Sequence, residues 1–381
     1  MSKFSKNINV KHKVLITTNP LDHEGGMVEF NKGLINAINK KENNINLEPF
    51  SIGSRMYLFY YPTLKKLLYI FFYLFDLFRL ITKLSNYKVK VIQVNPSLIP
   101  VPLFRDGIVL IINRFFFKKK SIIVLHGWKE HVYKSIINNK LLKYSIKKYF
   151  NSVDIIYVLS GEFKNKLINI GILESKIKTT TTFFYKENIS KESNPGSNVK
   201  LVKLLFLGRV SKLKGIEELI EALKIIAENH NDFLCNIIGH GDKPNTIENY
   251  KNVVDSYNLS DKIKFLGRIT GKEKFEAFSN SDIYIFPSYM EGCPTSVIEA
   301  LATGLFVISS DVGALNDIID SSNGIKTKPK NIKELVFALE KGLKNINQIR
   351  IQRKDISKDA FQKYEVSFIA DDFLQSYKAI L

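Results

Sequence analysis

Short apolar runs alternate with stretches of helical spacing along almost the whole chain. Each apolar run ends in glycine or small polar residues, and amphipathic segments such as 28–39 and 216–228 follow. This alternation is typical of βαβ units, whose parallel strands are buried on both faces. The runs expected as strands are 13–18, 91–94, 121–125 and 155–159 in the first half, and 204–207, 237–238, 264–267, 282–287 and 306–309 in the second. The pattern predicts an α/β protein in which 155–159 is the last strand of the first half.

Two glutamates eight residues apart stand out in the second half. Glu291 follows the predicted strand 282–287, and Glu299 lies in a predicted helix that ends at Gly304. Pro294 suits the first helical position, where its missing N–H costs nothing. The free N–H groups of a helix start bind a diphosphate, and carboxylates accept hydrogen bonds from sugar hydroxyls. Acids near a helix start are also common without any function, so the pair alone leaves both interpretations open.

A basic loop follows an earlier strand of the same half. Gly208 and Arg209 end the run 204–207, and Lys214 lies just before the helix that starts near Ile216. Ligands of such sheets bind beyond the carboxyl ends of the strands, which places both cations where phosphate oxygens would lie. The alternative is that they are solvated loop cations. Gly239 and Arg268 end two further apolar runs, although a short glycine motif by itself usually marks only a turn.

These motifs resemble the donor-binding signature of retaining glycosyltransferases of family 4. The match runs from Ser281 to Gly304 and extends upstream to about residue 203. The resemblance implies a GT-B fold, in which two Rossmann-like doubly wound domains face a central cleft. It implies that Glu299 binds the nucleotide ribose, that Glu291 contacts the donor sugar and that Arg209 and Lys214 clamp the diphosphate. The donor-binding residues expected from it are Gly208, Arg209, Lys214, Gly239, Arg268, Ile269, Glu291, Gly292, Cys293, Pro294, Thr295 and Glu299.

One segment departs from the family pattern. After the strand 306–309 the family often has two glycines and then a glutamate, whereas this chain has Ala314 and Asp317 at the second glycine and the acid. The departure puts the exact sugar contacts in doubt.

The first half carries two weaker site candidates. Gly25 and Gly26 lie between the first strand and the first helix, and His126 ends the strand 121–125. The resemblance assigns Gly25, Gly26 and His126 to the acceptor, and it places His126 with Arg209, Lys214 and Glu291 among the catalytic residues. A flexible loop and a structural histidine remain the alternatives.

The domain division follows from composition. The turn-rich segment 186–198 is predicted to link the domains. The acceptor-binding domain is therefore expected over 1–192, with an amphipathic C-terminal helix at 363–381 crossing back to it. The donor-binding domain is expected over 193–362.

Charge is concentrated in the first half. Residues 1–195 hold 31 Lys and Arg against 13 Asp and Glu, a net of +18 out of +19 for the chain. Such a domain attracts anionic surfaces. The aromatic segment 56–81 is interrupted by charges and is too short to span a membrane, so it is either a core helix or a helix at a membrane surface. Two cysteines and the lack of a signal peptide favour a cytoplasmic location, with peripheral contact at the inner face of the cytoplasmic membrane.

The expected function is retaining transfer of a sugar from a UDP-linked donor to an acceptor hydroxyl. The acceptor is expected to be a lipid-linked or growing saccharide in bacterial cell-surface polysaccharide synthesis, such as capsule or O-antigen. No Asp-x-Asp lies at a strand end, so no metal and no other cofactor is expected. The alternative is a nucleotide-sugar epimerase on the same fold. No nucleic-acid-binding motif accompanies the charge, so nucleic acid is not an expected partner.

Overall fold

The computed structural model describes residues 11–23, 25–52, 62–189 and 200–381, with side chains left undescribed for 62–70. The chain divides into two compact units. One contains the residues up to Thr180 together with Val366–Leu381, and the other contains Thr181–Glu365. The expected boundaries after residues 192 and 362 differ from these by 12 and 3 residues. Most of the predicted linker, from residue 190 on, lies outside the described residues.

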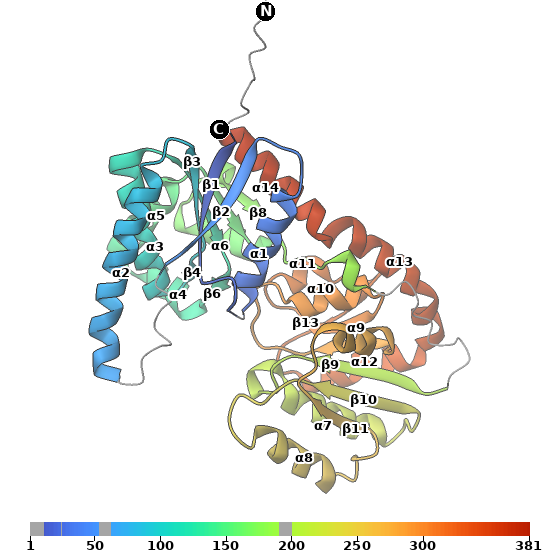
Figure 1. Ribbon diagram of the computed structural model, residues 1–381. Helices are drawn as coiled ribbons and strands as arrows, with labels where there is room; N and C mark the ends of the chain where they lie inside the picture. The colour runs from blue at the N-terminus through green and yellow to red at the C-terminus, as the bar shows by residue number, and fades with distance from the viewer. Residues whose placement is uncertain (1–10, 24, 53–61, 190–199) are drawn as a thin grey trace, which may run out of the picture. The chain divides into compact units, whose positions relative to one another are not determined.

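The first unit is built on a six-stranded parallel sheet of order β2-β1-β3-β5-β7-β8. Helices α2, α3 and α5 lie on one side of this sheet, with α1 and α14 on the other (Figure 1). Its strands are β1 (His12–Thr18), β2 (Ile45–Ser51), β3 (Val89–Val94), β5 (Lys120–Leu125), β7 (Ile155–Val158) and β8 (Ile177–Thr179), and β4 (Ser97–Leu98) pairs with β6 (Gly127–Trp128). Its helices are α1 (Gly26–Asn39), α2 (Pro62–Leu84), α3 (Pro100–Ile112), the π-helical turn η2 (Asn113–Phe117), α4 (Glu130–Asn138), α5 (Lys140–Asn151), α6 (Gly161–Ile170) and α14 (Val366–Ile380).

The sequence pattern missed four strands that the structure describes in this unit, namely the short pair β4 and β6 together with β8 and β2. The expectation that 155–159 is the last strand was wrong, because β8 pairs with β7 at the edge of the sheet. β8 has three residues, of which only Ile177 is buried, so it leaves almost no apolar signal. β2 was not predicted because Pro49 and polar residues interrupt its alternation.

Helix α14 is fixed to the first unit by a buried polar cluster. The hydroxyl of Tyr157 donates to Asp372 at 2.8 Å, and the ring of Phe373 stacks on Tyr157 at 4.1 Å. The hydroxyl of Tyr377 donates to Gln93 of β3 at 2.5 Å. The C-terminal helix therefore reaches the central strands of this sheet and stabilises their positions.

The second unit holds another six-stranded parallel sheet, of order β11-β10-β9-β12-β13-β14. Its strands are β9 (Val202–Leu207), β10 (Phe233–Ile238), β11 (Ile263–Gly267), β12 (Ile283–Phe286), β13 (Phe306–Ser310) and β14 (Gly324–Thr327). Its helices are α7 (Ile216–Ala227), α8 (Thr246–Ser256), α9 (Gly271–Ser279), α10 (Thr295–Ala302), α11 (Leu315–Ile318), α12 (Ile332–Lys344) and α13 (Ile346–Tyr364), with 3-10 turns at Lys186–Asn188 and Lys212–Lys214. The 3-10 turn Glu174–Lys176 belongs to the first unit. Both sheets are of the Rossmann type that the family resemblance implied, and both are built from the βαβ units that the pattern predicted.

Helix α13 anchors the start of β12. The guanidinium of Arg350 binds Asp282 through two nitrogens at 2.9 and 3.1 Å, and Arg353 donates to the carbonyl of Ser281 at 2.6 Å. The opposite end of the same strand leads into the loop that carries Glu291. Within the part of the chain that the structure describes, no helix is long and apolar enough to cross a membrane.

Candidate functional site

The order of the second sheet reverses between β9 and β12. Such a reversal separates the loops beyond two neighbouring strands and leaves a crevice in which ligands of open α/β sheets bind. Gly208 and Arg209 follow β9, and the loop with Glu291 follows β12. Gly208, Arg209 and the loop with Glu291 therefore lie on either side of the position where this topology places a ligand.

Lys214 and Glu291 form an ion pair across this position. The lysine Nζ binds Oε1 of Glu291, and the hydroxyl of Ser288 donates to the same oxygen at 2.6 Å. Lys214 also lies over the ring of Phe286, 5.3 Å from its centre. The backbone N–H of Tyr289 donates to the carbonyl of Leu213 at 3.0 Å, which ties the two loops together. Ser288 was not predicted, although it lies three residues before Glu291.

Gly208 and Gly239 hold the ends of β9 and β10 in close contact. A Cβ on Gly239 would lie 1.7 Å from the carbonyl oxygen of Gly208, and Gly239 has φ +152°. Only glycine fits that conformation and that approach. The structure thus gives Gly239 a packing role, and its predicted contact with the donor stays a prediction.

The remaining predicted cations differ in their surroundings. Arg209 is exposed and forms no ion pair with any residue that the structure describes. Arg268 is exposed after the edge strand β11, and Ile269 beside it is half-buried. Arg209 follows a central strand and Arg268 an edge strand, so the two lie on separate loops at the same edge of the sheet.

Helix α10 starts one residue later than expected. Pro294 is the residue that caps the helix, with φ −73° and ψ 118°, and Thr295 is its first helical residue. Placing Pro294 at the first helical position was therefore wrong by one residue. Below this helix start, the buried Tyr284 hydroxyl makes hydrogen bonds of 2.8 Å to the carbonyl of Leu207 and to Ser296. Tyr284 thus links the end of β9 to the first turn of α10.

Glu299 is buried in α10 and paired with a lysine that the sequence did not indicate. The Nζ of Lys274, on α9, lies 2.6 Å from Oε1 of Glu299. Burial raises the pKa of Glu299, and the neighbouring positive charge of Lys274 opposes that rise. Lys274 lies in a charged helix with one other lysine, Lys272, and nothing in that pattern distinguishes the two.

The departure from the family pattern is accommodated by the local backbone. Gly313 has φ +55°, and a Cβ there would lie 2.2 Å from the carbonyl oxygen of Glu291. Ala314 has an ordinary φ of −67°, and its N–H donates to the carbonyl of Gly292 at 2.8 Å. Glycine is therefore needed at 313 and not at 314. Asp317 is exposed on α11.

Cys293 points into the protein. Its sulfur lies 3.3 Å from both the backbone nitrogen and the hydroxyl of Thr182. Burial raises the pKa of this thiol to about 11. The side chain is thus a neutral packing group, and a donor contact at this position would come from the backbone.

The acceptor candidates lie around the corresponding reversal of the first sheet, between β1 and β3. Gly25 and Gly26 are exposed where α1 begins, and Phe30 on that helix packs edge-on against His126, with ring centres 4.9 Å apart. The Nε2 of His126 is 3.1 Å from Oδ1 of Asn95, and the amide of Asn95 donates to Thr17 at 2.7 Å. Because that amide nitrogen is used, Oδ1 accepts from Nε2–H of His126. Burial lowers the pKa of His126 to about 4, so the ring is neutral.

No group of three or more His, Cys, Asp or Glu side chains suitable for a metal ion occurs among the described residues. The titratable groups gathered near α10 are instead carboxylate and lysine pairs.

Comparison with known proteins gives a family match that lies within the second unit. The model of the family described as "Glycosyl transferases group 1" matches residues 187–363. An uncharacterized glycosyltransferase from Methanocaldococcus jannaschii is 29% identical over 241 residues, which cover 63% of this chain and 58% of that relative. An N,N'-diacetylbacillosaminyl-diphospho-undecaprenol alpha-1,3-N-acetylgalactosaminyltransferase from Campylobacter jejuni is 27% identical over 275 residues, covering 68% of each chain. The first three curated relatives are matched over only 55–62% of their own length.

Solved structures extend the likeness to both units. A sucrose-phosphate synthase from Thermosynechococcus elongatus superposes with a TM-score of 0.76 at 17% identity, covering 97% of this chain and 99% of that one. HepE from Anabaena, solved in complex with UDP, gives a TM-score of 0.71 at 16% identity and covers 97% of this chain and 100% of its own. At such identities the likeness establishes the fold. Residues 187–363 therefore match the family described as glycosyl transferases group 1, within a chain that has the GT-B fold.

Proposed function

We propose that this protein is a retaining glycosyltransferase that moves a sugar from a nucleoside-diphosphate donor to an acceptor hydroxyl. The observation that carries the proposal is the pairing of Lys214 with Glu291 at the reversal of the second sheet, next to the start of α10. The cation and the helix start suit a diphosphate, and the carboxylate suits sugar hydroxyls.

The chemistry requires a leaving group that is stabilised as it departs. The bond between the anomeric carbon and the diphosphate oxygen breaks while the acceptor oxygen bonds to the same face of that carbon. The acceptor proton passes to the departing phosphate oxygen. Arg209, Lys214 and the N–H groups at the start of α10 stabilise the developing negative charge of the diphosphate. Glu291 binds hydroxyls of the donor sugar, and Glu299 binds the ribose.

The donor is proposed to be UDP-linked and the acceptor lipid-linked. HepE, with the same fold, was solved with UDP, which supports the choice of base. The Campylobacter jejuni relative is named for a diphospho-undecaprenol acceptor, which supports a polyprenol-linked saccharide here. Relatives named for amylovoran and teichuronic acid biosynthesis support a role in cell-surface polysaccharide synthesis. His126, Gly25 and Gly26 are assigned to acceptor binding, at the inner face of the cytoplasmic membrane.

Transfer is proposed to need no metal ion, because lysine, arginine and backbone N–H groups neutralise the diphosphate. The named relatives above are transferases, so the comparisons give no support to the epimerase alternative.

The test uses the purified full chain. A thermal-shift screen with nucleoside diphosphates and nucleotide sugars identifies the donor, because a ligand that binds only the folded state stabilises it. The donor that stabilises the protein is then incubated with polyprenol-diphosphate saccharides, with and without EDTA. The proposal expects an α- or β-product that keeps the donor's configuration and a rate unaffected by EDTA. It fails if no nucleotide stabilises the protein, or if the donor is epimerised without an acceptor.

A further inference from the structure

Helix α2 of the first unit presents a row of apolar side chains to solvent. Phe71, Leu74 and Phe78 are 63%, 59% and 64% exposed. Their spacing of three and four residues places them on one side of the helix. The opposite side, with Leu77, Leu80 and Leu84, is buried in the unit. Helix α2 therefore has two apolar sides, and only one of them packs in the core of the unit. An exposed apolar row of this kind typically marks an interaction site.

Helix α3 extends the exposed row into a groove. Phe104 is 72% exposed, and it lines a cavity of about 530 Å³ together with Leu74. The hydroxyl of Tyr73 donates to the carbonyl of Arg105 at 2.8 Å, which joins the two helices beneath this groove. Val101, Ile108 and Ile111 continue the same side of α3, and Val101 and Ile111 are exposed. We call the exposed side of Phe71, Leu74, Phe78 and Phe104 the α2–α3 surface.

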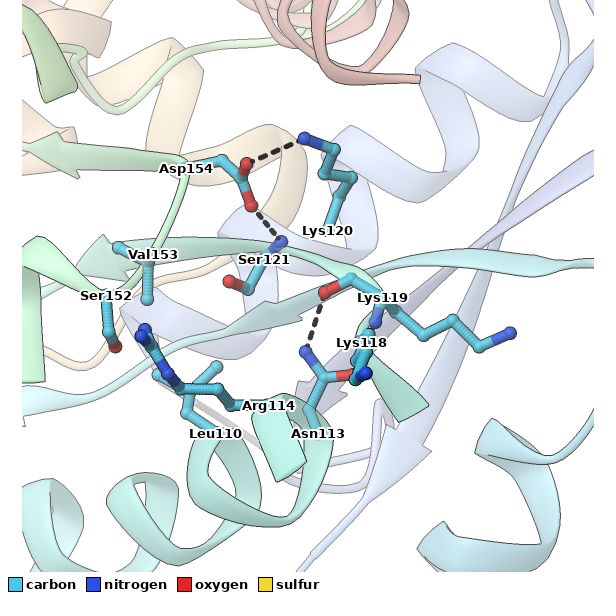
Figure 2. Close-up of a pocket in the computed structure, with 10 residues that line it drawn as sticks. All are labelled: Leu110, Asn113, Arg114, Lys118, Lys119, Lys120, Ser121, Ser152, Val153 and Asp154. Atoms are coloured by element: carbon cyan, nitrogen blue, oxygen red, sulfur yellow. Dashed lines mark hydrogen bonds and ion pairs between the residues drawn. The ribbon is translucent and has the colours of Figure 1, made fainter. Parts of the chain in front are cut away.

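A pocket lined by cations lies at the end of α3. Arg114, Lys118, Lys119 and Lys120 line a cavity of about 380 Å³ in which Asp154 is the only carboxylate among the lining residues. Figure 2 shows Asp154 bound to Lys120, at 3.1 Å, and to the backbone N–H of Ser121, at 2.8 Å. Asn113 accepts from Lys119 N–H at 3.2 Å and donates to its carbonyl at 2.8 Å, which holds the lysine loop in place. The cavity thus carries an excess of positive charge. We call it the basic pocket.

The positive charge of the basic pocket is incompletely neutralised. Lys118 and Arg114 are exposed and form no ion pair with residues that the structure describes. Partial burial and then the charge of Lys90 lower the pKa of Lys119. A bound phosphate group would relieve this repulsion. The pocket begins at the amino end of β5, whereas His126 follows the carboxyl end of the same strand, so the pocket is separate from the acceptor candidates.

We propose that the α2–α3 surface and the basic pocket together bind an anionic phospholipid membrane. The aromatic side chains enter the interfacial region of the bilayer, and the pocket binds lipid phosphate groups. Charge complementarity selects this occupant, since residues 1–195 carry +18 of the chain's net +19 and an anionic leaflet attracts such a surface. The exposed phenylalanines of the α2–α3 surface suit the apolar part of that environment, and the cations at the end of α3 suit its phosphate groups. The inference deepens the proposed function, on which its purpose rests, because the acceptor proposed above is lipid-linked.

The test measures sedimentation of the full chain with vesicles, in the absence of donor and acceptor. Vesicles of phosphatidylcholine alone are compared with vesicles containing phosphatidylglycerol, at low and high salt. The first variant combines Phe71→Ser, Phe78→Ser and Phe104→Ser. Its control combines Phe337→Ser and Phe368→Ser, which remove phenylalanines exposed to 65% and 53% elsewhere. The second variant combines Arg114→Gln and Lys118→Gln, and its control combines Lys333→Gln and Lys354→Gln on exposed positions of the other unit.

We expect the wild-type protein to bind anionic vesicles and to dissociate from them as salt is raised. The phenylalanine variant should lose at least about tenfold in partitioning, from the lost apolar insertion. The charge variant should lose about fivefold for each cation removed, and only with anionic vesicles. Both controls should bind as the wild type does. Thermal melting of every variant checks that the fold is kept, and the charge variant tests the proposal independently if the phenylalanine variant is unstable.

Three results would overturn the proposal. The first is that the wild-type protein does not bind anionic vesicles, and the second is that variants and controls bind equally. The third is that light scattering shows a dimer of the wild-type protein that the phenylalanine variant loses, while its vesicle binding is unchanged. The last would make the α2–α3 surface a contact between two copies of the chain. Failure of sugar transfer is separate, because vesicle binding needs no donor. Transfer to a water-soluble acceptor without vesicle binding would reject this inference and leave the proposed function standing.

Discussion

Lys274 and Glu299 form an ion pair in the second unit, with the lysine nitrogen 2.6 Å from the carboxylate. The carboxylate is buried, and burial raises its pKa. Lys274 therefore helps to keep Glu299 ionised. An ionised carboxylate accepts two strong hydrogen bonds, as binding of the ribose hydroxyls would require.

Replacing Lys274 by methionine should weaken nucleotide binding in a pH-dependent manner. Without the lysine the pKa of Glu299 rises further, so a larger fraction is protonated at neutral pH and below. We expect the UDP affinity of Lys274→Met to be lower than that of the wild-type protein at pH 6 and to recover as the pH is raised, because a protonated Glu299 is a poorer acceptor for the ribose hydroxyls. Titration calorimetry from pH 6 to 9 measures this.

The matched control is Lys272→Met on the same helix. Lys272 pairs with Glu276 at the surface, so its removal should leave UDP affinity unchanged at every pH. Glu299→Gln should bind UDP weakly with no pH dependence of this origin. If Lys274→Met instead loses the same affinity at pH 6 and pH 9, the lysine does not act through ionisation of Glu299.

Lys214 and Glu291 should each be needed for transfer and not for folding. Lys214→Ala removes a cation from the diphosphate, and loss of one such stabilising group typically costs about 10²-fold in kcat. Glu291→Gln should reduce kcat by a similar factor while UDP still binds, because the sugar and not the nucleotide loses its partner. Radiolabelled transfer assays and UDP thermal shifts separate the two effects.

Lys212→Ala is the control for this pair, since Lys212 lies on the same loop and binds Glu217 at the surface. Its kcat should equal that of the wild-type protein. Full activity of both Lys214→Ala and Glu291→Gln would reject the assignment of the site.

Gly239 should be among the least replaceable residues of the second sheet. An alanine Cβ there would lie 1.7 Å from the carbonyl of Gly208, and the strand ends would have to separate. We expect Gly239→Ala to lower the free energy of unfolding by at least about 2 kcal/mol more than Gly267→Ala. Gly267 also has a positive φ, of +72°, but no atom lies within 4 Å of the added Cβ. Urea denaturation measures the free energy of unfolding of both variants. Equal losses would show that the strand ends can move apart at little cost.

The central strands and the loop residues could be predicted because their signals are local. The apolar run 204–207 is largely buried, and Gly208 and Arg209 follow it directly, while Glu291 lies in the loop after the buried strand β12. The edge strand β8 gave no comparable signal, since it buries one residue of three, whereas the edge strand β11 was predicted from its apolar run 264–267. The GT-B fold itself was confirmed by the comparisons.

The partners of the predicted residues could not be inferred in the same way. Lys274 reaches Glu299 from a helix 25 residues earlier, and Asn95 reaches His126 from the loop after another strand. Such pairs depend on the order of strands in the sheet, which a single sequence does not reveal. The sequence did not decide whether the segment 56–81 forms a core helix or a helix at a membrane surface. In its described part, one side of the helix is buried and the other is exposed.

The buried ring of His126 should make the folded protein less stable as the pH is lowered below about 6.5. Its pKa in the folded protein is about 4, below the usual value of 6.5, because the ring is buried. The unfolded chain therefore binds a proton that the folded one does not between pH 6.5 and 4, and stability falls as the pH is lowered through this window. The difference in the free energy of unfolding approaches about 3 kcal/mol at the acidic end.

His126→Gln should abolish this part of the pH dependence in urea denaturation. Asn95→Asp places a carboxylate 3.1 Å from the ring and should raise the pKa of His126, reversing the effect. The control Asn169→Asp alters an exposed amide bonded to Tyr133 and should leave the profile unchanged. The pH profile of His126→Gln is subtracted from that of the wild-type protein. If the difference stays flat from pH 6.5 to 4, the histidine is already charged in the folded protein.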